Sequence, residues 1–357
     1  MDLQVNRTDL HRTRVVEADP TPLAEGQARL RVDAFGLSAN NVTYAVAGDL
    51  LQYWDFFPAD PGWGRIPVWG YADVAESTHP DLPEGRRCFG YLPMSEELVV
   101  TVGRVDDGGF SDVSSHRQAM ASAYSRYQLV DPAGAGTDDE DRRMLLYPLF
   151  FTAFLVDDFL DDQDRFGASV LVVSSASSKT ALGIARFAAA RPGLTVVGLT
   201  SPGKVTFVEG LGEFHQVLAY GQEAALPEGP AAYVDVSGSG TVRAAVHGRY
   251  GDQLVHDMVL GATHREELGA ETGPLAGAEP AFFFAPSQIA KRSADWGTAE
   301  LDRRLDEAWA TYAPWAAGWI RFQHASGPDA LTATYLELLD DRADPTVGHV
   351  LSLTRPT

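Results

Sequence analysis

The residues that most clearly suggest chemistry form a run of small hydroxyl side chains, Ser174-Ser-Ala-Ser-Ser-Lys-Thr-Ala181. This run lies between a continuous β-branched segment at 169–174 and a helical pattern at 181–190. A turn between a buried parallel strand and a helix presents backbone N–H groups and the positive end of the helix to an anion. The sequence therefore predicts a phosphate-binding turn. The residues expected to contact the phosphate are Ser175, Ser177, Ser178, Lys179 and Thr180.

This turn departs from the pattern that usually marks a dinucleotide site. Gly-x-Gly-x-x-Gly is absent, and serine and alanine replace the glycines that let a pyrophosphate approach the backbone. Two interpretations remain open. The turn is a modified dinucleotide site in which hydroxyl groups and Lys179 bind the phosphate, or it has lost its cofactor and kept the fold.

The segment after the next strand favours NADP over NAD. NAD sites usually hold a carboxylate there that accepts a hydrogen bond from the ribose 2′-hydroxyl, and Leu199-Thr-Ser-Pro-Gly-Lys204 contains none. Thr200, Ser201 and Lys204 are therefore predicted to bind a 2′-phosphate. Thr200 and Ser201 can equally cap the helix that follows.

Alternating strand and helix patterns must position these residues. Strands are expected at 169–174, 194–199, 216–219 and 231–236, and helices at 181–190, 205–211 and 238–248. This alternation predicts a doubly wound parallel α/β sheet, whose ligands bind at the carboxyl edge. Gly238 and Ser239 follow the fourth strand, so we predict that they contact the cofactor, with helix capping as the alternative.

Residues 1 to about 130 contain strands and turns instead. Residues 28–35 alternate apolar and polar side chains, as a half-buried strand does. The composition becomes small and acidic at 132–141, and a helix at 329–339 followed by a strand at 348–353 allows the chain to return. We predict two domains, a β-rich substrate and catalytic domain at 1–135 with 300–357 and a nucleotide-binding domain at 136–299.

The composition excludes several classes of partner. The 357 residues carry a formal net charge of −21, which opposes nucleic acid and anionic membrane surfaces. The single cysteine, Cys88, can form neither an intramolecular disulfide nor a multi-thiolate zinc site. No window is apolar enough to span a membrane, and the charged N-terminus lacks a signal-peptide core. We expect a cytoplasmic protein without a structural metal.

The chain resembles the medium-chain dehydrogenase/reductase superfamily. Residues Leu23–Tyr44 look like the superfamily's opening P-x-x-G-E-V-L-V-R-V-x-A-x-G-x-N-x-x-D, and Glu84-Gly-Arg-Arg-Cys-Phe-Gly-Tyr91 looks like its x-G-D-R-V-x-G strand. Residues 54–58, Pro67–Tyr71 and Phe284–Gly297 resemble an uncharacterised, domain-of-unknown-function branch. The resemblance implies a GroES-like domain followed by a Rossmann-type domain, and a possible homodimer.

Within that superfamily, the chain is similar to the zinc-free quinone and enoyl reductases. Gly70-Tyr-Ala stands where zinc enzymes have Gly-His-Glu, and the four-cysteine lobe is absent. The resemblance places Asn40, Asn41 and Tyr44 beside the nicotinamide, where the amides would bind a substrate carbonyl and the tyrosine would donate a proton. Tyr53 is a further candidate. The alternative is that the asparagines satisfy a turn and Tyr44 packs a helix.

Aromatic residues in a loop rich in proline and glycine suggest a substrate pocket, because pockets are mostly apolar. They can equally form a hydrophobic plug beneath the loop. Lys291 is expected to hold a substrate carboxylate or cofactor phosphate, with a solvated helix start as the alternative. The predicted pocket residues are Trp54, Phe57, Trp69, Tyr91 and Lys291.

These residues together predict a zinc-independent, NADP(H)-dependent oxidoreductase that transfers hydride to an enone, an enoyl thioester or a quinone. The expected partner is a small molecule, with an acyl thioester among the candidates. Two alternatives remain. One is a non-redox enzyme of the same fold that catalyses proton transfer or carbon–carbon bond chemistry on a ketone or thioester. The other is a non-catalytic small-molecule binder.

Overall fold

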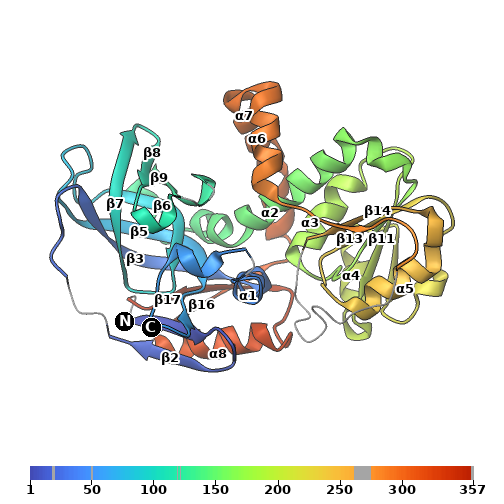
Figure 1. The fold of residues 1–357 in the computed structure, drawn as a ribbon, viewed down its shortest axis with the longest axis horizontal. Coiled ribbons are helices and arrows are strands. Elements are labelled where there is room, and N and C mark those ends of the chain that lie inside the picture. The colour runs from blue at the N-terminus through green and yellow to red at the C-terminus, as the bar shows by residue number, and fades with distance from the viewer. Residues whose placement is uncertain (18–20, 50, 119, 121, 261–274, 355–357) are drawn as a thin grey trace. The chain divides into compact units, whose positions relative to one another are not determined.

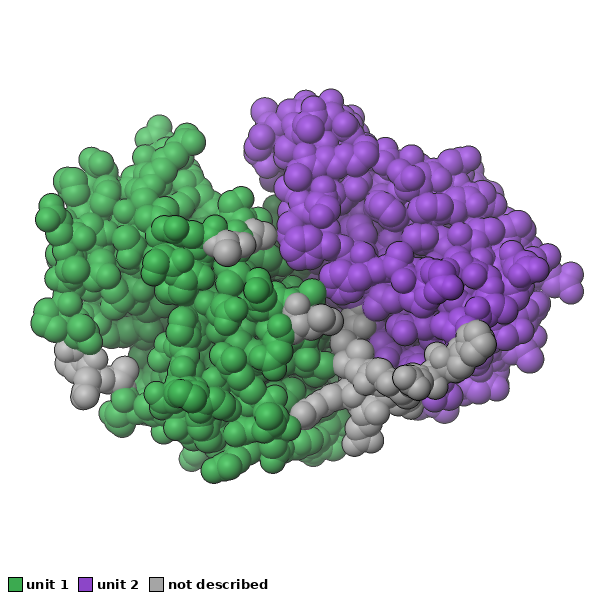
Figure 2. Space-filling view, viewed as in Figure 1, with its two compact units in different colours: residues 1–148, 316–357 green, residues 149–315 purple. Residues whose placement is uncertain are grey.

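The chain forms two compact units. The structure, a computed structural model, describes every residue except 18–20, 50, 119, 121, 261–274 and 355–357 (Figure 1). Unit 1 comprises residues 1–148 and 316–357, and unit 2 comprises residues 149–315 (Figure 2). Unit 1 is therefore built from both ends of the sequence.

Unit 1 contains a sheet that closes on itself around strand β3 (Gln27–Leu37) and is antiparallel except for the parallel pair β16 and β17. One edge of β3 pairs with β5 (Pro67–Ser77), and the other edge pairs with β7 (Glu97–Asp106) and then with β17 (Val347–Ser352). The strand order is β16-β17-β3-β5-β6-β9-β8-β7, and β7 pairs in addition with β3. The strands from β3 to β7 in this order therefore close into a barrel-like sheet. The other elements of this unit are β1 (Asp2–Asn6), β2 (Thr13–Val16), α1 (Ala39–Val46), β4 (Trp63–Gly64), β6 (Arg87–Pro93), β8 (Gly109–Asp112), β9 (Arg126–Val130), β16 (Arg321–Ser326) and α8 (Pro328–Leu339).

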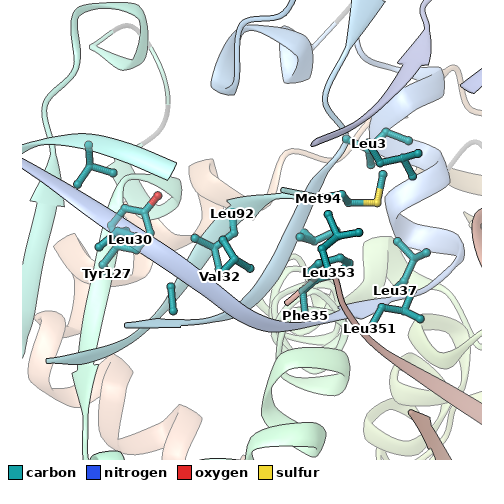
Figure 3. Close-up of a cluster of buried hydrophobic side chains, with 14 of the residues drawn as sticks. Leu3, Leu30, Val32, Phe35, Leu37, Leu92, Met94, Tyr127, Leu351 and Leu353 are labelled. Carbon is teal, nitrogen blue, oxygen red and sulfur yellow. The ribbon is translucent and has the colours of Figure 1, made fainter. Parts of the chain in front are cut away.

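The core of unit 1 joins residues from both ends of the chain (Figure 3). Phe35 on β3 pairs with Leu351 on β17, and both side chains are buried. The labelled side chains of the cluster are Leu3, Leu30, Val32, Phe35, Leu37, Leu92, Met94, Tyr127, Leu351 and Leu353. The C-terminal helix and strand thus complete the first unit.

Unit 2 contains a six-stranded, wholly parallel sheet in the order β12-β11-β10-β13-β14-β15. The order reverses beside β10, which is the switch point of a doubly wound sheet. The predicted α/β architecture is therefore confirmed. The elements are β10 (Val170–Val173), α3 (Lys179–Ala188), β11 (Thr195–Thr200), α4 (Val205–Leu211), β12 (Gln216–Ala219), β13 (Ala231–Asp235), α5 (Gly240–Tyr250), β14 (Leu254–Val259), β15 (Pro280–Phe282) and α6 (Ala285–Trp296).

Two proline-containing helices, α2 (Asp138–Asp162) and α7 (Thr298–Ala317), carry the chain from one unit to the other. The composition shift at 132–141 marks the loop and the acidic first turn of α2, which suits the positive helix end. The next turns of α2 still pack in unit 1. A Cβ atom on Gly36 would lie 2.8 Å from the Leu145 backbone, so glycine lets β3 and α2 meet. The compact units consequently divide at Pro148 rather than at the start of α2.

Candidate functional site

The serine-rich turn of unit 2 has the strand–turn–helix geometry that the sequence predicts. Ser178 is the N-cap of α3, and its hydroxyl accepts a hydrogen bond from the Ala181 N–H at 3.2 Å. Ser175 has a φ of +52°, a left-handed conformation that favours glycine. Its N–H donates to the Tyr220 hydroxyl at 2.9 Å. A serine therefore adopts the backbone conformation that glycine usually provides in such a turn. The hydrogen bond to Tyr220, which directly follows β12, holds the turn in this conformation.

A hydrogen-bonded pair, Ser174 and Asp235, ties this turn to the loop after β13. The Ser174 hydroxyl donates to the Asp235 carboxylate at 2.9 Å and accepts from the N–H groups of Val236 and Ser237, both at 3.0 Å. The same carboxylate oxygen accepts from the Ser237 N–H at 3.0 Å and the Gly238 N–H at 2.9 Å. We call the two loops, 174–178 and 236–239, the cradle. They lie at the carboxyl ends of adjacent strands, where ligands of such sheets bind.

Charged residues of β13, α5 and β14 form a group of ion pairs next to the cradle. Asp235, fully buried, pairs with Arg243 of α5 at 2.6 Å. Arg243 also lies 3.8 Å from Asp257 of β14, and His247 Nε2 lies 2.9 Å from the Asp257 carboxylate. His247 Nδ1 lies 2.7 Å from the Ala276 carbonyl. Both imidazole nitrogens thus face acceptor oxygens, which fits the protonated ring.

The pKa of His247 reflects this arrangement. Burial alone lowers the pKa, but the hydrogen bonds to Asp257 and to the Ala276 carbonyl outweigh it. The pKa of His247 is therefore raised above its ordinary value of 6.5.

The other predicted cofactor residues lie where strands of unit 2 end and where its helices begin. The Thr200 hydroxyl donates to Ser177 at 3.3 Å, which links the end of β11 to the turn. Ser201 is the N-cap of a short 3-10 turn without a side-chain capping bond. Ser239 does cap α5, accepting from the Val242 N–H at 3.3 Å. Lys204 lies at the start of α4. Lys179, Thr180 and Gly238 lie at the starts of α3 and α5.

Three of the predicted catalytic residues, Asn40, Asn41 and Tyr44, lie on α1, and the fourth, Tyr53, begins a 3-10 helix at 53–56. Tyr44 and Tyr53 belong to a group of aromatic side chains that we call the aromatic cluster. The Tyr44 ring lies 4.5 Å from the Tyr53 ring and 5.9 Å from the Tyr91 ring, measured between centroids. Trp69 lies 5.1 Å from Tyr91. The members of the cluster are Tyr44, Tyr53, Phe56, Phe57, Trp69, Tyr91 and Tyr124.

The Tyr44 hydroxyl is suited to hold a proton. Burial and the neighbouring Tyr124 raise the pKa of Tyr44 well above its ordinary value, and contacts with Asn40, Trp69 and Tyr91 offset only part of the rise. The neutral hydroxyl of Tyr44 is therefore favoured and its phenolate is unfavourable.

Asn41 has a different environment from Asn40. The Asn41 side-chain oxygen accepts from the Ser38 N–H at 2.8 Å, and its amide donates to the Pro67 carbonyl at 2.9 Å. This pair of bonds caps α1 and joins it to β5. The Asn41 amide is thus occupied by backbone groups, while Asn40 faces Tyr44.

Two predicted pocket residues, Trp54 and Lys291, are not members of the aromatic cluster. Trp54 is 1% exposed and packs in the main core of unit 1, where a Cβ atom on Gly48 would overlap its ring. Lys291, in unit 2, pairs with Asp162 at 3.1 Å and Asp295 at 2.6 Å on the surface of α6. Phe57, Trp69 and Tyr91 belong to the cluster.

The sequence analysis did not identify Tyr124 or Arg117. Arg117 is fully buried, donates to Asp112 at 2.9 Å and to the Tyr124 carbonyl at 2.7 Å, and lies 5.1 Å from the Phe57 ring centroid. It anchors the segment that carries Tyr124. Residues 113–125 show no periodic pattern that would have revealed this role.

Two buried donors of the cluster have no hydrogen-bond partner, the Tyr91 hydroxyl and the Trp69 indole nitrogen. Among the described residues, no group of three or more His, Cys, Asp or Glu side chains can hold a metal ion. Within the same part of the chain, no helix is long and apolar enough to cross a membrane.

Comparisons with known proteins agree with this architecture. A family model described as "Protein of unknown function (DUF2855)" matches residues 35–344. No curated protein matches the chain.

Solved structures share the fold at low sequence identity. CurA from Vibrio vulnificus in complex with NADPH superposes with a TM-score of 0.63 at 13% identity, over 96% of this chain and 95% of that chain. YhdH of E. coli K-12 with bound NADPH gives 0.56 at 15% identity, over 98% and 99%. A quinone oxidoreductase of Pseudomonas syringae gives 0.57 at 14% identity, over 98% and 99%. These likenesses confirm the predicted fold, a GroES-like unit and a Rossmann-type unit.

We predict that the buried His247–Asp257 pair makes stability depend on pH. Because the folded state holds the His247 proton more tightly than the unfolded chain, its stabilisation is complete below pH ~6.5 and is lost as pH rises through the raised pKa. In the wild type, the free energy of unfolding measured with urea should decrease as the pH increases from about 6.5 through the raised pKa of His247. In His247→Gln this decrease should be smaller.

The exposed His116 provides the control, because His116→Gln should leave the pH dependence unchanged. The charged groups that face His247 are Asp257 and, behind it, Arg243 and Asp235. Identical pH profiles for the wild type and His247→Gln would contradict the prediction.

Proposed function

The chain belongs to the DUF2855 family of proteins of unknown function, and we propose that it is a zinc-independent, NADP(H)-dependent oxidoreductase. In the proposed reaction, hydride passes to an activated C=C or carbonyl group of a small molecule. The observation that carries the proposal is the cradle, two loops that are hydrogen-bonded to each other through Ser174 and Asp235 at the switch point of a doubly wound sheet.

The charge balance of the cradle fits a phosphate-bearing cofactor. Asp235 would repel phosphate, but it is fully buried and neutralised by Arg243 at 2.6 Å. No carboxylate follows β11, where an NAD-selective site would hold one. Lys204 and the hydroxyl groups of Thr200 and Ser201 are the groups that we propose for the 2′-phosphate.

The similar structures give independent support at the level of fold. CurA and YhdH are described with NADPH, and another neighbour is described as a quinone oxidoreductase. We infer from these descriptions that this chain also binds NADPH. The remaining predicted contacts, held by the loops and by the starts of α3 and α5, are Ser175, Ser177, Ser178, Lys179, Thr180, Gly238 and Ser239.

We propose that Tyr44 completes the reduction by donating a proton. When bound, NADPH supplies the hydride. The raised pKa of Tyr44 keeps the proton on the hydroxyl until a basic intermediate takes it. We propose that the Asn40 amide, beside Tyr44, donates to a substrate carbonyl oxygen, and that Asn41 acts by fixing the start of α1.

We also propose that two copies of the chain associate through β15. This edge strand pairs only with β14 among the described strands, and its three residues are exposed. Phe282 is 53% and Phe284 42% exposed, beside a cavity of about 180 Å³ lined by Phe159, Met258 and Phe283. An open strand edge with apolar side chains is a template for pairing with another strand.

The first prediction for this function concerns cofactor choice. Lys204→Ala and Lys179→Ala should weaken NADPH binding, with Lys204→Ala raising the dissociation constant ~10-fold, because one charge-assisted phosphate contact contributes about 1.5 kcal/mol or more. NADH, which lacks the 2′-phosphate, should be affected less by Lys204→Ala. Titration by fluorescence or calorimetry measures both constants.

Arg104→Ala removes an equal charge from an exposed site in unit 1 and should change neither constant. Equal weakening of NADPH and NADH by Lys204→Ala would overturn the assignment to the 2′-phosphate. No binding of either cofactor at millimolar concentration would favour the non-redox enzyme or the non-catalytic binder.

The second prediction concerns the proton donor. Tyr44→Phe should lower kcat ~100-fold, the usual contribution of a general acid, and leave the dissociation constant for NADPH unchanged. NADPH oxidation should be followed with methyl vinyl ketone, crotonyl-coenzyme A and phenanthrenequinone as probes of the three substrate classes. Tyr71→Phe, at a buried tyrosine outside the aromatic cluster, is the control. Unchanged turnover would remove Tyr44 from the mechanism.

The third prediction concerns assembly. Light scattering should give twice the mass of the 38.6 kDa chain for the wild type, and Phe282→Asp should give the monomer mass, because a charge at an apolar interface is costly. Val113→Asp changes a similarly exposed apolar residue, 44% exposed in unit 1, and should leave the dimer intact. A monomeric wild type at micromolar concentration would contradict the proposal.

A further inference from the structure

Unit 2 contains a cavity at the β15 side of its sheet that the proposed reaction does not use. The cavity has a volume of about 180 Å³ and lies among β14, β15, α2 and α6. We call it the edge cavity. Its lining includes Phe159, His256, Met258, Phe283, Ser287 and Gln288. The cradle follows β10 and β13, so the edge cavity is formed by a different part of the same sheet.

The alternation of β14 determines which of its side chains line the edge cavity. Successive side chains of a strand point to opposite faces of the sheet. His256 and Met258 therefore share one face, and both line the cavity. Asp257, between them, belongs to the other face, where it pairs with His247 of α5. The cavity face of β14 thus carries one polar ring and one apolar side chain, without a carboxylate.

A strained turn holds an aromatic ring against His256. The Phe166 ring lies 4.0 Å from the His256 ring, between centroids, and the two planes differ by 8°. Asp164, Arg165 and Phe166 have φ values of +47°, +54° and +56°, a left-handed conformation that costs non-glycine residues free energy. Arg165 donates to the Pro192 carbonyl at 3.2 Å. Strain of this kind persists where the surrounding structure imposes it, and it is common at ligand sites. Here it fixes one face of the imidazole.

Three polar groups of the edge cavity are available to a ligand. The His256 ring and the Ser287 hydroxyl make no hydrogen bond to any residue that the structure describes. Gln288 is buried, and its amide donates to Asp158 at 2.6 Å. Within the same described residues, the side-chain oxygen of Gln288 accepts no hydrogen bond. A ligand that enters the cavity therefore meets unused hydrogen-bonding groups.

The state of His256 determines what such a ligand can offer. Burial lowers the pKa of His256 below its ordinary value of 6.5, although Asp257 opposes part of this effect. The neutral ring has one N–H donor and one acceptor nitrogen. The described lining contains no Asp, Glu, Lys or Arg, so a charged ligand would be buried there without a partner, which is costly. The cavity consequently favours a neutral molecule with a hydroxyl group.

The size and the walls of the edge cavity favour a single aromatic ring. An apolar cavity of about 150 Å³ binds benzene, so about 180 Å³ accommodates a benzene ring with one small substituent. Phe159 and Phe283 lie 5.6 Å apart at 65°, and a flat ring packs well against such side chains. Phe282 and Phe284 also line the cavity and are exposed, so a ligand would remove apolar surface from water.

We propose that the edge cavity is a binding site for a neutral, phenol-sized aromatic molecule that carries a hydroxyl group. The ring of the ligand packs against Phe159, Met258 and Phe283. Its hydroxyl group exchanges hydrogen bonds with His256 and with the side-chain oxygen of Gln288. Ser287, which is exposed, lies where the cavity meets solvent. This site is independent of the cradle and of the proposed reduction.

The site also differs from the association that we propose for β15. Strand pairing uses the backbone N–H and C=O groups at the edge of β15. A ligand in the edge cavity would instead contact side chains of β14, α2 and α6. A side chain of a second copy is the alternative occupant, and it would compete with the ligand more strongly at higher protein concentration.

Binding can be measured with a probe inside the cavity. The full-length chain has five methionines, and labelling of their methyl groups gives an NMR signal for Met258, which Met258→Leu assigns. Phenol should shift this signal with a dissociation constant of ~1 mM, as expected for so small a ligand. Fluorobenzene has a similar shape but no O–H donor. It should bind ~10-fold more weakly, because it cannot donate to a cavity acceptor.

Three variants test the assignment of the polar groups. His256→Phe keeps a ring stacked on Phe166 and removes the nitrogens, so it should abolish the ~10-fold preference for phenol and leave fluorobenzene binding unchanged. Ser287→Trp, at an exposed position of the lining, should obstruct the cavity and weaken both ligands ~10-fold without unfolding the chain. His116→Phe, at an exposed position of unit 1, is the control and should bind both ligands as the wild type does.

Several outcomes would overturn the inference. A Met258 signal that does not shift with phenol on the order of 10 mM would exclude the site. Equal affinities for phenol and fluorobenzene in the wild type, or a preference for phenol that persists in His256→Phe, would exclude recognition of the hydroxyl group. Phenol affinity that falls as the protein concentration rises would show that a second copy fills the cavity. The measurement needs no turnover, so failure of the proposed function would leave it intact.

Discussion

Buried carboxylates paired with arginine are the interaction on which both units depend. A carboxylate removed from water is tolerated only when a cation and hydrogen bonds replace its solvation. Unit 1 contains the pairs Arg87–Glu140 and Arg117–Asp112, and unit 2 contains Arg243–Asp235 and the pair of Arg292 with the half-buried Asp158. Each pair joins two separate elements of its unit. Removal of one partner would leave a buried charge, so these pairs determine which loop conformations are available.

The same pairing explains how so acidic a chain can present an anion site. The sequence has 28 basic residues against 49 acidic ones, and all but three of the basic residues are arginine. Arginine suits buried pairs because its planar fork meets a carboxylate at two points and it retains its charge. The lysines are Lys179 and Lys204 beside the cradle and Lys291 on the surface of α6. Arginine thus neutralises the interior, and two of the three lysines remain where the proposed cofactor phosphates would bind.

How much of the structure can be predicted from the sequence depends on how far apart in the chain the interacting residues lie. The strands β10 to β13 of unit 2 are short apolar runs flanked by small residues, so their positions and parallel order follow from local pattern and from the handedness of crossovers. The sequence analysis did not predict β14, whose run contains His256 and Asp257. Asp235 ends an apolar run, and its charge in that context is a signal that the sequence analysis did not use. Arg117 and Tyr124 give no comparable signal, because the contact of Arg117 with Asp112 and that of Tyr124 with the aromatic cluster depend on a loop without periodicity. The split of α2 between units likewise depends on how β3 approaches Leu145, which composition does not reveal.

Unit 1 buries both paired charges and neutral hydroxyl groups, and this difference restricts the chemistry that we propose for it. The buried Arg87 and Arg117 are paired with carboxylates, whereas the hydroxyl groups of Tyr44 and Tyr91 in the aromatic cluster remain neutral, because burial raises the pKa of both above the ordinary value near 10. An acid this weak gives up its proton only to a stronger base. The enolate formed when hydride adds to an enone or enoyl thioester is such a base, whereas the oxyanion of a hydroquinone has the basicity of an ordinary phenolate. The desolvation that surrounds Tyr44 therefore favours reduction of an activated C=C bond over reduction of a quinone as the proposed reaction.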